Sequence, residues 1–174
     1  MPPSTRDRMI LSTALLVRER GARATSIDDV LAHSGAPRGS VYHHFPGGRD
    51  ELLREATRFA ADYVARRLSG DGDPLAKLDA FVEGYRADLI ANDFRPGCPI
   101  VAVAIEDGAG LQELAAEAFT RWEDLLTAAF GSRELAVTTI AALEGALVMS
   151  RAAKSVEPLD TVHRHLRAQL KGSP

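Results

Sequence analysis

Cysteines, long apolar runs and enzyme motifs are all scarce in this sequence, and each scarcity excludes a class of protein. Cys98 is the only cysteine, so the chain has no internal disulfide framework and a structural zinc site is disfavoured. No window holds the roughly 18 uninterrupted apolar residues of a membrane helix. The N-terminus, MPPSTRDRM, has no signal-peptide core, so we expect a cytoplasmic protein with no membrane partner.

The common catalytic and cofactor motifs are absent as well. The sequence has no GxxxxGK[ST], no strand–GxGxxG–helix unit, no HExxH and no nucleophile elbow. The pairs His43–His44 and His163–His165 are spaced too closely to share a helix face, because zinc-binding helices place their histidines at i and i+4. We predict no enzyme, no cofactor and no metal.

Charge is unevenly distributed along the chain, whose formal net charge is −3. Residues 1–68 hold 11 Lys and Arg against 8 Asp and Glu, whereas residues 69–174 hold 10 against 16. A basic front half and an acidic back half suggest two tasks, one of them with a polyanion.

Apolar residues recur at helical spacing almost throughout, which predicts an all-α fold of about nine helices. Thr25 and Ser26 each have an Asp three residues on, so they are expected to cap a short second helix that ends at Ser34-Gly35. A third helix is expected with Pro37 in its first turn. The apolar stretch after Cys98 is interpreted as a buried helix starting at Pro99.

The segment SGDGDP, residues 69–74, is the clearest boundary. It predicts a three-helix front domain over residues 1–48, a connecting helix over 49–68, and a second helical domain over 69–174.

The stretch APRGSVYHHF, residues 36–45, is the most informative part of the sequence. Two short helices joined by Ser34-Gly35-Ala36 match a helix-turn-helix, whose second helix enters the DNA major groove. Val41 and Phe45 are then expected to face inward, with an outward face of Arg38, Gly39, Ser40, Tyr42 and His43. Arg, Ser, His and Tyr suit contacts with bases and phosphates, and Gly39 allows close approach. Tyr42 as a core residue remains an alternative.

Residues 24–53, ATSIDDVLAHSGAPRGSVYHHFPGGRDELL, resemble the DNA-binding domain of TetR-family transcriptional repressors. The form Gly-Ala-Pro-Arg-Gly-Ser with Phe-Pro-Gly-Gly, and Gly-Cys-Pro later, is similar to the LmrA/YxaF-like branch. The resemblance implies phosphate contacts by Thr25 and Ser26 at a helix N-terminus, and by Arg49. Pro37 departs from the family, which often has Ser or Thr there as an N-cap.

The resemblance further implies that the C-terminal domain binds a ligand and dimerises. Aromatic and aliphatic residues between about positions 81 and 147 are expected to line the ligand cavity: Phe81, Tyr85, Leu89, Val101, Ile105, Phe119, Trp122, Leu126 and Leu147. Small residues in the helix over about 133–154 permit close approach of a second copy.

These expectations combine into a homodimeric repressor that binds a pseudo-palindromic double-stranded DNA operator through residues 25–49. A small, mostly apolar or aromatic inducer releases it by favouring a conformation that no longer fits the operator. Two alternatives stay open: a redox-responsive regulator acting through Cys98, and a small-molecule-binding protein without specific DNA recognition. The sequence favours a buried, inert Cys98 over a redox sensor.

Overall fold

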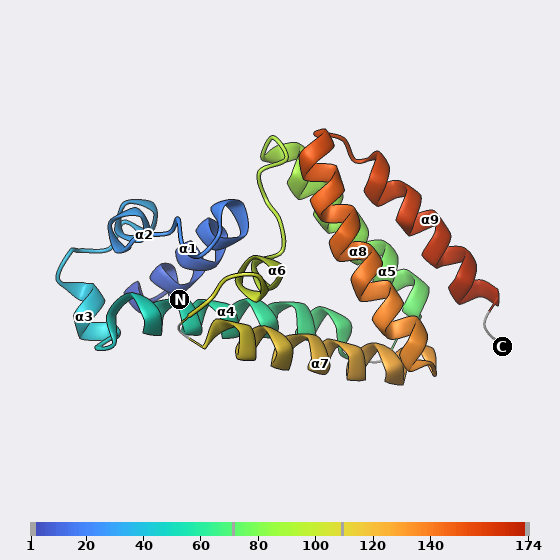
Figure 1. The fold of residues 1–174 in the computed structure, drawn as a ribbon, viewed down its shortest axis with the longest axis horizontal. Helices are drawn as coiled ribbons and strands as arrows, with labels where there is room; N and C mark the ends of the chain where they lie inside the picture. The colour runs from blue at the N-terminus through green and yellow to red at the C-terminus, as the bar shows by residue number, and fades with distance from the viewer. Residues whose placement is uncertain (1–2, 71, 109, 173–174) are drawn as a thin grey trace. The chain divides into compact units, whose positions relative to one another are not determined.

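A computed structural model describes residues 3–70, 72–108 and 110–172 of the chain. Within these residues the fold is entirely helical, with nine helices and no strand, so the predicted all-α class is confirmed (Figure 1). The helices in chain order are α1 (Thr5–Arg20), α2 (Ile27–Ser34), α3 (Ser40–His44), α4 (Gly48–Leu68), α5 (Pro74–Ala91), α6 (Pro99–Ala104), α7 (Leu111–Phe130), α8 (Arg133–Ala153) and α9 (Glu157–Gly172).

The chain forms two compact units that differ from the division expected from the sequence. The N-terminal unit combines Met1–Tyr63 with Cys98–Ala118, and the C-terminal unit combines Val64–Gly97 with Phe119–Pro174. α6 and the start of α7 therefore group with the helix-turn-helix rather than with the helices that follow SGDGDP, and α6 packs against α1. A linear boundary at residues 69–74 could not anticipate this return of the chain.

The first two helices begin with reciprocal caps. Ser4 and Asp7 form a capping box at α1, and Ser26 and Asp29 form another at α2. The cap expected at Ser26 is thus confirmed, whereas the hydroxyl of Thr25 turns back to donate to the carbonyl of Gly21 at 2.8 Å.

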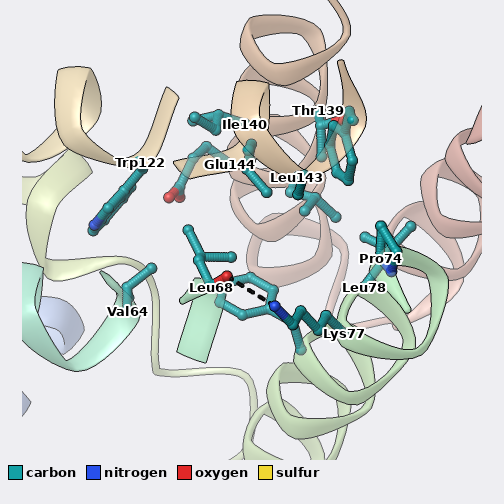
Figure 2. A pocket seen from close by; sticks show the side chains of 14 residues that line it. Val64, Leu68, Pro74, Lys77, Leu78, Trp122, Thr139, Ile140, Leu143 and Glu144 are labelled. Atoms are coloured by element: carbon teal, nitrogen blue, oxygen red, sulfur yellow. Dashed lines mark hydrogen bonds between the residues drawn. The ribbon is translucent and has the colours of Figure 1, made fainter. Parts of the chain in front are cut away.

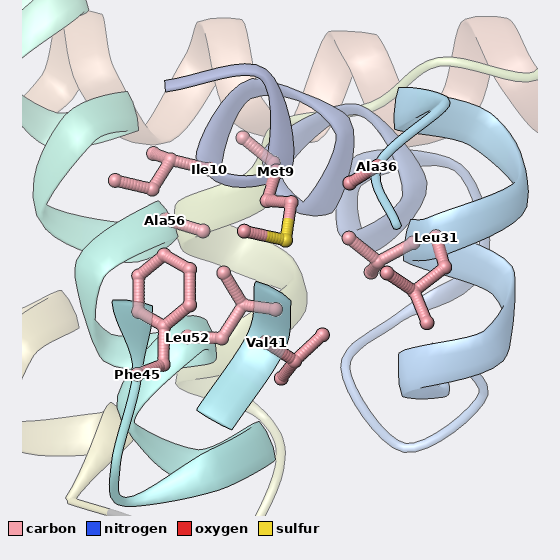
Figure 3. Packing of buried hydrophobic residues seen from close by; sticks show 10 residues of the cluster. Met9, Ile10, Leu31, Ala36, Val41, Phe45, Leu52 and Ala56 are labelled. Atoms are coloured by element: carbon pink, nitrogen blue, oxygen red, sulfur yellow. The ribbon is translucent and has the colours of Figure 1, made fainter. Parts of the chain in front are cut away.

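One apolar cluster holds the N-terminal unit together (Figure 3). Met9 of α1, Val41 of α3 and Phe45 are completely buried, and Leu52 and Ala56 of α4 complete the contact. Truncating a buried Phe to Ala typically costs about 3–5 kcal/mol. This burial fixes which face of α3 looks inward and therefore which face is left outside.

α3 begins later than expected. The helix starts at Ser40, and Pro37 lies in the preceding loop, so its expected place in the first helical turn is wrong. The carbonyl of Pro37 accepts both the backbone N–H of Ser40, at 2.9 Å, and its hydroxyl, at 2.5 Å. This turn takes the place of a helical first turn and leaves α3 only five residues long.

The C-terminal unit has a separate core formed by α5, α8 and α9. Leu89 of α5, Leu147 of α8 and Leu166 of α9 are almost completely buried in it. By length and composition alone, α8 is apolar enough to span a membrane, although charged residues interrupt it. Leu143, Ala146 and Leu147 of α8 are buried in this core.

Candidate functional site

α3 presents polar side chains outward over its buried apolar ones. Tyr42 is 66% exposed and His43 is exposed beside it, while Val41 is fully buried. Tyr42 as a core residue is therefore wrong. The side chain of Arg38, in the loop before α3, is 85% exposed. The residues expected on the outward face thus include three large groups able to contact another molecule.

Ser26 lies in the exposed start of α2, where its hydroxyl serves the helix cap. It accepts the N–H of Asp29 at 3.2 Å and donates to the Asp29 carboxylate at 2.5 Å. The hydrogen bonds from Ser26, hydroxyl first, hold the pKa of Asp29 below its ordinary value, and Arg20 at 3.0 Å adds to this effect. The negative charge of the Asp29 carboxylate is therefore already compensated by Ser26 and Arg20.

Thr25 is buried, and Arg49, although its side chain is 37% exposed, is tied to backbone carbonyls of the protein. Thr25 is 2% exposed, and its hydroxyl is committed to Gly21. The guanidinium of Arg49 donates to the carbonyl of Thr25 at 2.9 Å and to that of Ala22 at 2.5 Å. Both residues fix the turn between α1 and α2, a role that the sequence did not reveal.

Ser40 and Gly39 differ in how the fold uses them. The Ser40 hydroxyl donates to Pro37, which closes the turn before α3. Gly39 has a helical φ of −72°, and a Cβ added there would meet no atom within 4 Å. Neither backbone conformation nor packing inside the protein requires glycine at this position.

A hollow in the N-terminal unit brings together Thr25, Ser26, Arg38, Tyr42 and Arg49, whereas Gly39, Ser40 and His43 are not among its lining residues. Three guanidinium groups, those of Arg23, Arg38 and Arg49, surround it together with the N-terminus of α2. Free N–H groups and the helix dipole at such an end favour an anion. Arg38 pairs with Asp28 at 3.3 Å, but both side chains are largely exposed, so the pair is weak and Arg38 can exchange Asp28 for a phosphate. Arg23 was missed from the sequence, although it is a basic residue just before the expected α2.

The C-terminal unit contains a small apolar cavity of about 50 Å³ that is partly open to solvent (Figure 2). Its walls come from α4, α5, α7 and α8. The lining residues are Val64, Leu68, Pro74, Lys77, Leu78, Phe81, Trp122, Leu126, Ala129, Phe130, Thr139, Ile140, Leu143 and Glu144.

Three polar side chains interrupt the apolar wall: Lys77, Thr139 and Glu144. The ammonium of Lys77 donates to the carbonyls of Leu68 and Gly70, at the end of α4. The Thr139 hydroxyl is buried without a hydrogen-bond partner among the described residues. All three polar residues were missed, because sequence analysis selected the lining by apolar character alone.

Of the nine residues predicted to line the cavity, Phe81, Trp122 and Leu126 do so. The remaining six are elsewhere. Leu89 and Leu147 fill the α5–α8–α9 core. The Tyr85 ring packs at a tilt beside Phe81, with centroids 4.9 Å apart, and Phe119 meets Trp122 edge to face, with centroids 5.5 Å apart.

Val101 and Ile105 lie outside the cavity for a different reason. Both belong to the α6 segment, which groups with the N-terminal unit. Ile105, at the end of α6, is 79% exposed, so its expected place in a cavity wall is wrong.

Two family models match the chain. Residues 10–56 match the model of the tetR family of bacterial regulatory proteins. Residues 74–165 match the C-terminal domain of LmrA/YxaF-like transcriptional regulators. The chain belongs to the TetR family of bacterial transcriptional regulators. The resemblance to the LmrA/YxaF-like branch is confirmed by the same matches.

Individual relatives of this TetR-family regulator extend over nearly its whole length. An uncharacterised HTH-type transcriptional regulator of Mycobacterium tuberculosis is 47% identical, over 93% of this chain and 92% of its own. The HTH-type transcriptional regulator LmrA of Bacillus subtilis is 26% identical, over 89% and 90%. The crystal structure of a TetR regulatory protein from Rhodobacter sphaeroides has the same fold, with a TM-score of 0.82, 21% identity and coverage of 95% and 98%.

A further surface of this TetR-family regulator lies on α8. Val137, Val148 and Met149 are 41%, 55% and 60% exposed, and the small residues Ala141 and Gly145 between them are exposed too. Their spacing places them on one helical face, opposite the buried residues that pack against α5 and α9. Large apolar side chains gathered on one exposed face mark a contact surface.

Cys98 precedes α6 and is 6% exposed. A buried thiol is poorly reached by oxidants, and reactive cysteines are generally partly exposed. The burial favours the structural interpretation of Cys98 over the redox-sensor alternative.

Proposed function

We propose that the protein is a cytoplasmic, homodimeric repressor that binds a pseudo-palindromic DNA operator and is released by a small, mostly apolar inducer. The observation that carries this proposal is the exposed face of Arg38, Tyr42 and His43, held in place by the buried Val41 and Phe45. In the helix-turn-helix mode this face enters the major groove.

The DNA-contacting part of one protomer, its reading head, consists of the N-terminus of α2 and of α3 with the loop before it. We propose that it makes two kinds of contact. Arg38, Tyr42 and His43 contact base edges, while the start of α2 with Ser26 and Arg23 binds a phosphate. Gly39 and Ser40 allow the loop to approach the DNA backbone closely. Thr25 and Arg49 contribute by holding the turn before α2, and the Arg49 edge that faces the hollow adds positive charge there.

The exposed α8 face supports the homodimer. Val148 and Met149 would be removed from water by a second copy, with Gly145 allowing the two helices to approach. α9 lies beside α8, so two copies would form a four-helix interface. Two reading heads about 34–36 Å apart then fit half-sites one helical turn apart.

The apolar cavity supports the inducer. Its wall is dominated by aliphatic and aromatic groups, so burial of apolar ligand surface drives binding, and Lys77, Thr139 and Glu144 select the ligand's polar groups. An inducer that prefers a conformation in which the heads no longer fit their half-sites releases DNA by population shift. A coupling free energy of about 1–3 kcal/mol is typical for this kind of effect.

The first test is selection of DNA from a random pool by the full-length protein at about 0.15 M salt, where non-specific binding is weakened. We expect a palindrome with half-sites one turn apart. Arg38→Ala should weaken binding to it by about 5- to 150-fold, the range expected for losing one base-contacting arginine. Arg95→Ala, an exposed arginine of the C-terminal unit, is the matched control and should bind like wild type. If no motif is enriched, the proposed operator binding is contradicted. The alternative of a small-molecule-binding protein without specific DNA recognition would then stand.

The second test uses Trp122, the single tryptophan of the chain, which lies in the cavity wall. The neutral fluorescent probe N-phenyl-1-naphthylamine should quench Trp122 emission on binding by energy transfer. A screened compound that displaces the probe and also lowers operator affinity would be an inducer. Compounds that displace the probe while leaving operator affinity unchanged throughout the screen would contradict the release mechanism.

A further inference from the structure

The turn between α1 and α2 is held by a carboxylate from a distant part of the chain. Glu106, just after α6, accepts the backbone N–H of Ala22 on Oε1 at 2.7 Å and that of Arg23 on Oε2 at 2.6 Å. All these residues belong to the N-terminal unit. A single carboxylate thus fixes two consecutive peptide groups, and hydrogen bonds of this charged kind are about twice as strong as neutral ones.

The turn is shaped to receive this carboxylate. Gly21 has a φ of +86°, and a Cβ added there would lie 2.6 Å from Oε1 of Glu106. Any other residue would therefore be strained in its backbone and would also collide with the Glu106 side chain. The same turn is held on its other side by Arg49, which donates to the carbonyls of Ala22 and Thr25.

The held segment leads directly into the DNA-facing hollow. Arg23, whose N–H is bound by Glu106, contributes its side chain to the hollow, and Ser26 begins α2 only three residues later. Glu106 itself is anchored by α6, in which Ile100 and Val103 are fully buried and which packs against α1. Displacement of the carboxylate would therefore free Arg23 and the start of α2 together.

We propose that Glu106 is a positioning residue for DNA binding: by holding the Ala22 and Arg23 amides it sets the place of Arg23 and of the α2 N-terminus on the DNA backbone. This inference rests on the proposed DNA-binding function. It predicts that neutralising Glu106 weakens DNA binding, whereas the loss of a negative charge alone would strengthen it. A glutamate near a phosphate site repels DNA, so on Coulombic grounds alone its neutralisation should raise affinity.

The test measures operator affinity by fluorescence anisotropy for full-length wild type, Glu106→Gln, Glu106→Asp and Asp107→Asn. Gln removes the charge and places an NH₂ donor against a backbone donor, whereas Asp keeps the charge but shortens the reach. We expect both Glu106 variants to bind on the order of tenfold more weakly, within the usual range of coupling effects. Asp107→Asn removes the same charge from the next, exposed residue and should bind as wild type or slightly tighter.

Amide hydrogen exchange separates positioning from general loss of stability. Both Glu106 variants should exchange faster at Ala22 and Arg23, while the amides of α4 keep their protection. Wild-type affinity in Glu106→Asp, or tighter binding by Glu106→Gln, would overturn the positioning role and leave the DNA-binding proposal intact. If wild type binds no selected DNA, the DNA-binding function fails, and the positioning role fails with it.

Discussion

The two units of this protein expose opposite kinds of chemistry. The N-terminal unit buries its apolar residues in one cluster, presents arginine and tyrosine around the start of α2, and exposes His43 on α3. The C-terminal unit encloses an apolar cavity and exposes Val148 and Met149 on one face of α8. In the proposed function, the N-terminal unit binds DNA, while the C-terminal unit binds an apolar ligand and a second copy of the chain. The first three predictions below each change one of these surfaces, and the last one tests a contact between α5 and α9.

The largest effect is expected from Gly145→Arg on the α8 face. A Cβ at Gly145 meets no atom within 4 Å, and glycine is a poor helix former, so the protomer should tolerate arginine. A second copy approaching this face would meet a buried charge. We expect a species of 18.7 kDa in place of the dimer, and operator affinity reduced by about a hundredfold or more because two linked half-site contacts become one.

Light scattering coupled to size exclusion measures the mass, and anisotropy measures the affinity. Ala128→Arg, at an exposed alanine of α7, is the control that adds the same charge away from the α8 face. An unchanged dimer in the Gly145 variant would mean that the protein associates through another surface.

Gly39→Ala tests the polar surface with the smallest possible change. The φ of −72° and the empty space around Gly39 suit alanine, so thermal stability should stay equal or rise by about 0.4–1 kcal/mol. Operator affinity should nonetheless fall, by about tenfold, because the added methyl group stands between the loop and the DNA backbone. Unchanged or higher stability together with lower operator affinity would show that Gly39 lies against the DNA. Unchanged operator affinity would show that Gly39 is not part of the interface.

Ala129→Phe tests the cavity. Ala129 lines it, and a phenyl ring there would occupy space that the ligand needs. We expect about tenfold weaker binding of N-phenyl-1-naphthylamine, comparable to the loss of one to two kcal/mol of apolar contact. Ala128→Phe, on the exposed side of the same helix, should bind the probe like wild type. Equal affinities for both variants would place the probe outside this cavity.

Features that depend on a few neighbouring residues could be predicted from the sequence. The α2 cap at Ser26 and the start of α6 at Pro99 were predictable, because caps and prolines act within one helical turn. The outward face of α3 followed from the same local periodicity. The start of α3 was not predictable, because the residues around Pro37 are compatible both with the turn that forms and with a first helical turn.

Long-range features had no local signal. The cavity wall combines four helices, so an apolar residue such as Leu147 could equally belong to the core, which is where it lies. The contact of Glu106 with Ala22 joins residues 84 positions apart. The hydrogen bonds of Arg49 to the carbonyls of Thr25 and Ala22 likewise join residues 24 and 27 positions apart, so no local pattern in the sequence indicated them.

The smallest effect concerns Asp79, which ties α5 to α9 in the C-terminal unit. Its carboxylate accepts hydrogen bonds from Arg167 and, at 2.7 Å, pairs with Nε2 of His163. The hydrogen bond from Arg167 is the largest cause that holds the pKa of Asp79 below its ordinary value of 3.8; burial opposes it, and the hydrogen bond with His163 adds a smaller lowering effect. A carboxyl whose pKa is lowered by folding stabilises the protein above its unfolded value, and this contribution disappears as pH falls through the folded value.

Asp79→Asn should therefore lower the free energy of unfolding near pH 7, by less than about 1 kcal/mol because the side chain is about one-third exposed. The difference from wild type should shrink as pH falls below 3.8 and the wild-type carboxyl takes up its proton. Urea unfolding at fixed protein concentration, at pH 7 and near pH 3, measures both values. Glu83→Gln, a more exposed acid on the same helix, should change little at either pH. A loss for Asp79→Asn that stays constant with pH would mean that the aspartate stabilises α5 and α9 by packing rather than by its charge.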